Sequence, residues 1–249
     1  MAIIDKPSDY FNTKLYVGNG GTQSITGLDF QPDWVWIKNR SSAQNNRLFD
    51  SVRGAGFNLV SNATSAQIAA GTGTDGQLRS FTSDGFTVGS DGSVNKNNEN
   101  IVSWNWKAGT SFTNDASSTG IGSIDSAGSV NTDAGFSIVS WSGNSSTATV
   151  GHGLGAVPKI IFVKERTNTS GWYTYQEPTG NGNAMSLESS GASFGTTAWN
   201  STTPTSSVFS LGNNGAVNNS GDTYIAYCFA EKQGYSKFGS YTGNGNADG

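Results

Sequence analysis

An internal duplication constrains the fold of this chain more than any other feature of its sequence. Three phrases recur in the same order at a nearly constant spacing: YVGNG (16–20) and WSGNS (141–145), PDWVWIKNR (32–40) and PKIIFVKER (158–166), NIVSWNWKAG (100–109) and TYIAYCFAEK (223–232). Self-similarity at a fixed period is the signature of repeated structural units. The sequence therefore predicts two tandem units, and a last YTGNG at 241–245 predicts the start of a third.

The repeat also sets the expected domain boundaries. We expect the first unit over residues 1–109, the second over 134–233, and the opening strand of a further repeat or a terminal extension over 234–249. Residues 110–133 are a Ser/Gly/Asp-rich stretch whose composition buries too little apolar surface to fold alone, so they are predicted to be a linker or insert. We further expect the natural gene product to continue past Gly249 with more units.

The recurring phrases are predicted to be the strands of an all-β fold. In WVWI (34–37) apolar side chains alternate onto both faces, as in a strand buried on both sides. In VSWNWK (102–107) the apolar residues share one face, as in a half-buried antiparallel strand. Asn-Gly and Asp-Gly pairs between the phrases indicate tight turns. Each unit is therefore predicted to be an antiparallel β-sandwich, lectin-like or jelly-roll-like, with a helical pattern only at 61–71.

Charge and composition exclude several classes of partner. The net charge is −4, charged residues make up 13% of the chain and no basic run occurs, so we expect no nucleic-acid binding. No apolar stretch reaches the ~20 residues of a membrane helix, and the N-terminus lacks a secretory signal pattern. We therefore expect a protein that is made in a cytoplasm, does not insert into a membrane and is not exported by that route.

The residues that could carry chemistry each have a simpler structural interpretation. Cys228 has no second cysteine to pair with, and His152, the one histidine, lies in a glycine-flanked turn. Asp50 and Arg53 are expected to form a surface ion pair. Four aspartates are candidates for a calcium site or a glycosidase pair, although their loop positions are typical of turn-shaping residues: Asp84, Asp91, Asp125 and Asp133. We predict no catalytic residue and no cofactor, and leave a structural calcium ion as an alternative.

Aromatic residues are the better candidates for a binding site, because exposed aromatic faces are suited to stacking against sugar rings. Four tryptophans lie in predicted strands and are expected to belong to the core: Trp34, Trp36, Trp104 and Trp106. Four other aromatic residues lie in polar, loop-like phrases and are the predicted contacts for a glycan or partner: Trp172, Tyr173, Tyr175 and Trp199.

Several phrases of the chain are distinctive: YVGNGGTQSITGLDFQPDWVWIKNRS, LFDSVRGAG, SDGFTVG, VSWNWKAG, VGHGLGAVPKIIFVKER and GDTYIAYCFAEKQGYSKFGSYTGNG. Together they resemble a repeated domain of structural proteins from marine tailed bacteriophages, notably those of cyanobacteria and other oceanic bacteria. The resemblance covers nearly the whole chain except 110–133. It implies a virion component, with tail fibres or host-attachment proteins among the long members, and brings no established active-site residues. A shorter phrase, DGFTVG…NIVSWNWKA, is similar to H-type lectin domains.

These observations give one leading hypothesis and two alternatives. The leading hypothesis is a non-enzymatic virion structural protein, a tail-associated fibre or adhesin that binds host surface glycan, with repeated units providing avidity. The first alternative is a capsid decoration or virion-stabilising protein that binds other virion proteins. The second is a glycan depolymerase, which needs a cleft with paired carboxylates. Adhesins of this kind are commonly homotrimers, so we expect a homo-oligomer, with a trimer favoured, located in the virion.

Overall fold

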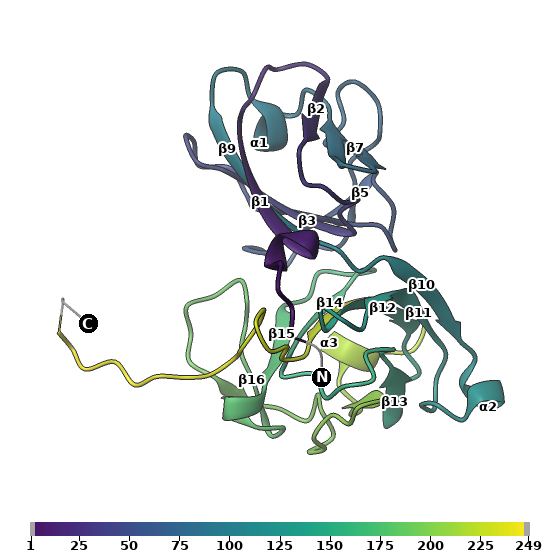
Figure 1. Ribbon diagram of the computed structural model, residues 1–249. Helices are drawn as coiled ribbons and strands as arrows, with labels where there is room; N and C mark the ends of the chain where they lie inside the picture. Colours follow the sequence, from purple (N-terminus) through teal and green to yellow (C-terminus); the bar gives the residue numbers. More distant parts are fainter. Residues whose placement is uncertain (1–2, 247–249) are drawn as a thin grey trace.

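The computed structural model describes residues 3–246 and shows an all-β protein, as predicted (Figure 1). One six-stranded sheet has the order β1 (Phe11–Val17), β9 (Asn100–Trp106), β3 (Trp34–Asn39), β4 (Arg47–Asp50), β5 (Phe57–Val60), β6 (Ile68–Ala69). A second has the order β10 (Thr110–Asn114), β11 (Ser126–Asn131), β12 (Phe136–Ser142), β19 (Thr223–Phe229), β14 (Ile160–Glu165), β15 (Trp172–Gln176). All pairs of neighbouring strands in these two sheets are antiparallel.

The two large sheets follow one pattern over four strands each. The order β1-β9-β3-β4 in the first unit corresponds to β12-β19-β14-β15 in the second. The register agrees as well, because Trp34 lies opposite Trp106 in the first sheet and the aligned Ile160 lies opposite Phe229 in the second. The similarity between the repeated phrases therefore extends from the sequence to the pairing of individual residues.

Smaller elements cover the outer face of each large sheet. In the first unit they are β2 (Gln23–Thr26), β8 (Gly85–Val88), β7 (Leu78–Thr82) and the short helices η1 (Pro7–Asp9) and α1 (Gly92–Asn95). In the second they are β13 (Ala148–Gly151), β18 (Val208–Leu211), β16 (Asn183–Ala184), β17 (Phe194–Gly195), α2 (Ala116–Thr119), η2 (Glu177–Thr179) and α3 (Gly215–Asn218). No helix among residues 3–246 is long and apolar enough to cross a membrane.

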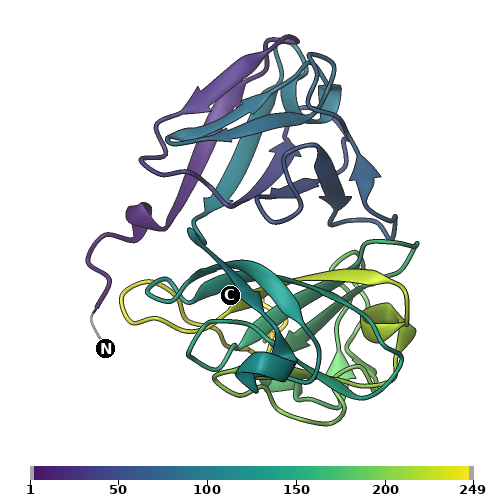
Figure 2. The same ribbon diagram turned by 90° about the vertical axis from the view of Figure 1, so that its right-hand side faces the viewer.

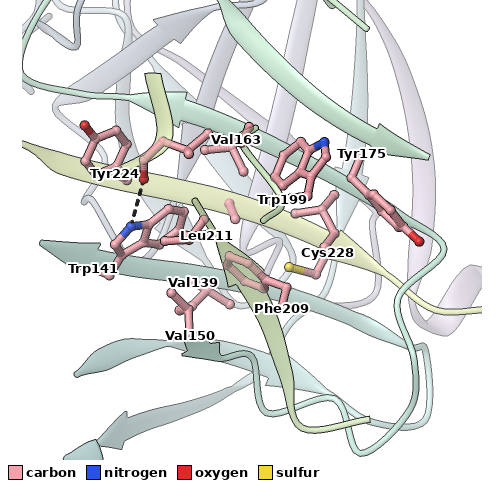
Figure 3. Packing of buried hydrophobic residues seen from close by; sticks show 14 of the residues in the cluster. Val139, Trp141, Val150, Val163, Tyr175, Trp199, Phe209, Leu211, Tyr224 and Cys228 are labelled. Atoms are coloured by element: carbon pink, nitrogen blue, oxygen red, sulfur yellow. Dashed lines mark hydrogen bonds between the residues drawn. The ribbon is translucent and has the colours of Figure 1, made fainter. Parts of the chain in front are cut away.

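Three apolar clusters hold the layers together. One lies inside the first unit and includes Val35 and Ile37 of β3. A second lies inside the second unit, where Figure 3 shows Trp141 and Tyr224 among its side chains. The third lies between the two large sheets and includes Trp34, Trp172 and Tyr227, so the inner faces of the two units pack against each other (Figure 2). The predicted burial of β3 on both faces is confirmed.

The prediction for β9 is wrong in one respect. Ser103 and Asn105 are completely buried, whereas Trp104 and Trp106 on the opposite face are partly exposed. Side chains alternate along a strand, so Ser103 and Asn105 share the face of Ile101, which belongs to the core of the first unit. Asn105 donates there from Nδ2 to the Asn12 carbonyl oxygen at 3.0 Å, while its Oδ1 is buried without a partner.

Residues 110–133 were predicted to be a linker or insert, and their ordered strands contradict the first of these alternatives. They form β10, α2 and β11, and β11 pairs with β12, the first strand of the second unit. Small residues permit this close pairing, because a Cβ atom at Gly128 would lie 1.9 Å from the Ile138 carbonyl oxygen. Asp115 caps α2 by accepting from the Ser118 N–H. Composition alone missed the order that pairing with a neighbouring strand provides.

Two other segments also differ from the sequence prediction. Residues 61–71 contain no helix and instead carry the short strand β6. The described part of 234–249 carries no strand, only a bridge between Lys232 and Ser236, after which the chain runs away from the body of the molecule (Figure 1). The last three residues of the predicted segment, 247–249, lie outside the described residues.

Candidate functional site

Three of the four aromatic residues predicted as contacts belong to the core. Trp172 is 0% exposed, and Tyr175 and Trp199 are each 2% exposed. The two tryptophans donate their indole N–H groups to the backbone oxygens of Val60 and Asn183, both at 2.9 Å. Figure 3 shows Tyr175 and Trp199 within the core of the second unit. The expectation that these three rings are exposed is wrong, because polar sequence neighbours do not decide which way a strand residue points.

Tyr173, the fourth predicted contact, is half-buried on β15 and packs edge-on against Phe194, with their ring centroids 5.4 Å apart. It does not line the pocket described below. The aromatic residues that do line this pocket include three of those expected to belong to the core, Trp34, Trp36 and Trp106. Trp34 is fully buried as expected, whereas Trp36 and Trp106 pack against the core but are only partly buried.

An aromatic pocket of 380 Å³ lies at the junction of the two units. This volume is within the range typical of small-molecule sites. The first unit contributes Phe11, Trp34, Trp36 and Trp106, and the second contributes Ala134, Phe136, Ile160, Phe162 and Phe229, with Tyr235, Ser236 and Phe238 from the following segment. We call this hollow the junction pocket.

The junction pocket is built from the same four positions of both units. The aligned pairs are Phe11 and Phe136, Trp34 and Ile160, Trp36 and Phe162, Trp106 and Phe229. Strand pairing explains why they gather, because Phe11 and Trp34 both lie opposite Trp106, and Phe136 and Ile160 both lie opposite Phe229. One duplicated sheet face thus packs on its own copy and leaves a hollow between them.

Trp34 holds the walls of the pocket in place. Its ring is stacked on Tyr227 of the second unit with centroids 4.2 Å apart, and lies 4.5 Å from the ring of Trp106. A stacked contact with Phe136 at 5.8 Å adds a second link across the junction. Aromatic pairs of this kind contribute about 0.5–1.5 kcal/mol each beyond the area they bury. The pocket is therefore a preformed feature of the packed units.

The indole N–H groups divide the seven tryptophans into two classes. The N–H groups of Trp141, Trp172 and Trp199 donate to backbone oxygens. Those of Trp34, Trp36, Trp104 and Trp106 make no hydrogen bond within residues 3–246, and Trp34 Nε1 is completely buried without a partner. A buried indole N–H normally finds an acceptor, and leaving one unpaired costs about 1–3 kcal/mol. The pocket therefore combines apolar ring faces with unused hydrogen-bond donors.

A buried polar triad connects the two units beside this pocket. Arg53 Nε lies 2.5 Å from Asp50 Oδ2, and the Tyr227 hydroxyl donates to the same oxygen at 2.6 Å. Both charged side chains are fully buried, so the predicted surface ion pair is in fact an internal one. Burial raises the pKa of Tyr227 well above its usual value, which keeps its hydroxyl protonated and able to donate. The triad links the units and offers no accessible group for catalysis.

His152 and three of the four aspartate candidates, Asp84, Asp91 and Asp125, have structural partners. The Leu154 N–H donates to His152 Nδ1 at 3.2 Å, so Nε2 carries the proton and donates to the Thr205 oxygen at 3.1 Å. Burial lowers the pKa of His152 to about 4, which leaves the ring neutral. Asp84 accepts the N–H groups of Gly27 and Asp29. Within residues 3–246 no group of three or more His, Cys, Asp or Glu side chains is placed to hold a metal ion.

Two further aspartates shape the loops of the second unit and also line a polar groove. Asp125 accepts the Ala116 N–H, and Asp115 caps α2. The groove has a volume of 800 Å³ and is also lined by Arg166. Hydrogen bonds from Ser117 and Ser118 lower the pKa of Asp115, which is opposite to the raised pKa that a glycosidase acid requires.

Comparison with known proteins identifies a family without an assigned activity. A family model described as a domain of unknown function (DUF7483) matches residues 6–249. No curated protein and no solved structure matches the chain.

Proposed function

The chain belongs to the DUF7483 family, and we propose, from its sequence resemblance, that it is a non-enzymatic structural protein of a marine tailed phage particle. In this proposal the protein is tail-associated and attaches to carbohydrate on the host surface. The link to phage particles comes from the sequence resemblance, and the proposed mode of attachment comes from the junction pocket.

One observation carries the attachment proposal: the junction pocket presents ring faces together with indole donors that the protein itself leaves unpaired. A sugar has an apolar C–H face that stacks on an aromatic ring and oxygen atoms that accept hydrogen bonds. Trp36 and Trp106 are partly exposed and supply both features. Trp34 lines the same pocket, but its unpaired indole N–H is completely buried.

The fold provides a rigid site. The two units are joined by the Trp34–Tyr227 stack and by the triad of Asp50, Arg53 and Tyr227, so little ordering is needed when a ligand enters. Weak sites become effective when several copies engage one surface, because each further binding event is then intramolecular. A structural protein present in many copies suits that mode of attachment.

The apolar character of most of the pocket lining favours a second candidate function. A capsid decoration or virion-stabilising protein would place an apolar side chain of another virion protein in the same hollow, against Phe162 and Phe229 for example. The two candidates differ in the chemistry of the occupant and not in the site. The depolymerase alternative has less support, because the lowered pKa of Asp115 in the polar groove disfavours a proton-donating acid there.

Binding of labelled protein to intact host-type marine cells, with extracted lipopolysaccharide as competitor, tests the proposal. Trp36→Ala or Trp106→Ala should each weaken saturable binding by about fivefold, since one stacked ring contributes on the order of 1 kcal/mol. Trp104→Ala is the matched control, because Trp104 is partly exposed on the same sheet face and does not line the pocket. Circular dichroism checks that each variant folds.

The conservative variant Trp106→Phe separates stacking from hydrogen bonding at the same position. Equal losses in the pocket variants and in Trp104→Ala would contradict the proposal, as would the absence of saturable binding. Capture of a virion protein that Trp106→Ala abolishes, without binding to cells or lipopolysaccharide, would favour the second candidate.

A further inference from the structure

β1 is a seven-residue edge strand with apolar side chains exposed to solvent. It pairs with β9 on one side and with no strand among residues 3–246 on the other. Leu15 is 62% exposed and Val17 is 54% exposed. A long, apolar, unpaired edge is a template for pairing with another chain, and proteins usually protect such edges with charges, bulges or covering segments.

The hydrogen bonds at the ends of β1 show which backbone groups face outward. The Lys107 N–H donates to the Tyr10 oxygen, and the Gly18 N–H donates to the Glu99 oxygen. In an antiparallel ladder alternate residues bond to the same neighbour, so the even-numbered residues of β1 face β9. The backbone groups of Thr13, Leu15 and Val17 therefore point away from the sheet.

Two of these outward groups are already satisfied by nearby side chains. The Thr13 N–H donates to Asn12 Oδ1 at 2.9 Å, and the Val17 oxygen accepts from Gln23 Nε2 at 3.1 Å. The Leu15 N–H, the Leu15 oxygen, the Thr13 oxygen and the Val17 N–H have no such side-chain partner within residues 3–246. The free edge thus displays a specific pattern of donors and acceptors.

That pattern is complementary to itself, and we propose that β1 pairs antiparallel with β1 of a second copy of this chain, centred on Leu15. Each Leu15 N–H then donates to the Leu15 oxygen of the other copy, and each Val17 N–H donates to the Thr13 oxygen. The Thr13 N–H and the Val17 oxygen also lie opposite each other in this register, so Asn12 Oδ1 and Gln23 Nε2 give up these contacts as the strands meet and the two backbone groups bond each other. Residues directly opposite in an antiparallel pair exchange both bonds in this way.

The side chains agree with this register. Leu15 meets Leu15 of the other copy, and Val17 meets Thr13, so the exposed apolar groups pack across the new pair. Lys14, the one charged residue of β1, lies opposite Tyr16 and not opposite the second Lys14. The axis of this two-fold pair is perpendicular to the sheet, so Phe11 and the junction pocket of each copy lie on the same face. If the pocket binds glycan, the pair presents two sites to one surface.

The other edges of the two large sheets lack this combination of length, exposed apolar side chains and free backbone groups. β10, the edge of the second large sheet, is a run of Thr, Ser, Phe, Thr and Asn. β15 is bridged by Met185 through Thr174, and β6 has two residues. A two-fold pair through β1 gives a dimer, which differs from the trimer expected from the resemblance to adhesins.

Engineered disulfides in the full chain test the register. Opposed residues that exchange both hydrogen bonds have Cα atoms about 5.5 Å apart, a distance suited to a disulfide. Leu15→Cys should therefore form a cross-linked dimer on mild oxidation. Thr13→Cys is the matched control, because the two Thr13 residues lie four positions apart, about 13 Å along the strand. The natural Cys228 is buried and does not compete.

Light scattering of the unmodified chain should give twice its 25.9 kDa mass, and Leu15→Lys should return it to 25.9 kDa. Thr113→Lys on β10 places the same charge on the other sheet edge and should leave the dimer intact. A monomer or trimer in the unmodified chain would overturn the proposal, as would cross-linking of Thr13→Cys in preference to Leu15→Cys. Mass and cross-linking are measured without carbohydrate, so this outcome is independent of the proposed glycan binding.

Discussion

The two large sheets differ at the edge where their first equivalent strands, β1 and β12, lie. In the second unit β12 is covered by β11 and β10, whereas the equivalent strand of the first unit, β1, has no neighbouring strand on that side among residues 3–246. The side chains differ accordingly, because Leu15 and Val17 of β1 align with Ser140 and Ser142 of β12. The two sheets share a strand order but differ at this edge. Residues 110–133 cover it in the second unit, and the apolar strand β1 forms it in the first. The comparison identifies residues 110–133 as an edge cover and shows why the proposed pairing is placed on β1.

The largest predicted effect concerns the triad, which exists only where the two units meet. Asp50→Ala leaves the buried Arg53 without its counter-ion. We expect the free energy of unfolding, measured by urea titration, to fall by about 3–5 kcal/mol. Tyr227→Phe removes one hydrogen bond and should cost about 1 kcal/mol. A loss for Asp50→Ala no larger than that for Tyr227→Phe would show that the buried ion pair does not link the units.

A second prediction is specific to the second unit, because the aligned phrase of the first unit has no histidine. The pKa of His152 is lowered from 6.5 to about 4, so the unfolded chain binds more protons between these values. Stability contributed by the neutral ring is complete above about pH 6.5 and falls by roughly 3 kcal/mol as pH drops toward 4. Thermal unfolding of His152→Gln should lack this part of the pH dependence. If His152→Gln shows the same pH dependence of thermal unfolding as the unmodified chain, this pH dependence does not come from His152.

Removing the cover of the second unit should make its edge behave more like that of the first. A Cβ at Gly128 would collide with the Ile138 carbonyl oxygen, so Gly128→Val should separate β11 from β12 at a cost of about 1–3 kcal/mol. Light scattering should then detect association beyond that of the unmodified chain. Gly195→Ala, where a Cβ meets no atom within 4 Å, is the control and should change neither quantity.

The smallest effect is expected at the uncovered edge. Leu15 is exposed, so Leu15→Ser should change the stability of the folded monomer by less than about 0.5 kcal/mol in dilute solution. Hydrogen exchange at the backbone amides of β9 should stay slow in this variant. Unfolding of β1 on this substitution would show that Leu15 serves the monomer core and would weaken the contrast between the edges.

Much of the fold could be predicted from the sequence because the repeat and the strand alternation are local signals. The order of residues 110–133 could not, since Ser and Gly gain order there only through pairing with β12. Alternation indicates which side chains share a face, yet it does not reveal what covers that face. For this reason Trp36 and Trp106 were expected in the core and Trp172 outside it. Asp50 and Arg53 are neighbours in sequence, but their burial depends on Tyr227 of the other unit.

The most direct test of the account is nuclear magnetic resonance of the indole N–H groups during titration with host-type lipopolysaccharide oligosaccharide. The seven tryptophans give one signal each, and single substitutions assign them. We predict that the signals of Trp34, Trp36 and Trp106 shift in a saturable manner, while those of Trp141, Trp172 and Trp199, whose N–H groups are bonded to the backbone, stay in place. Saturable shifts confined to the second group, or none at all, would contradict a glycan site at the junction of the two units.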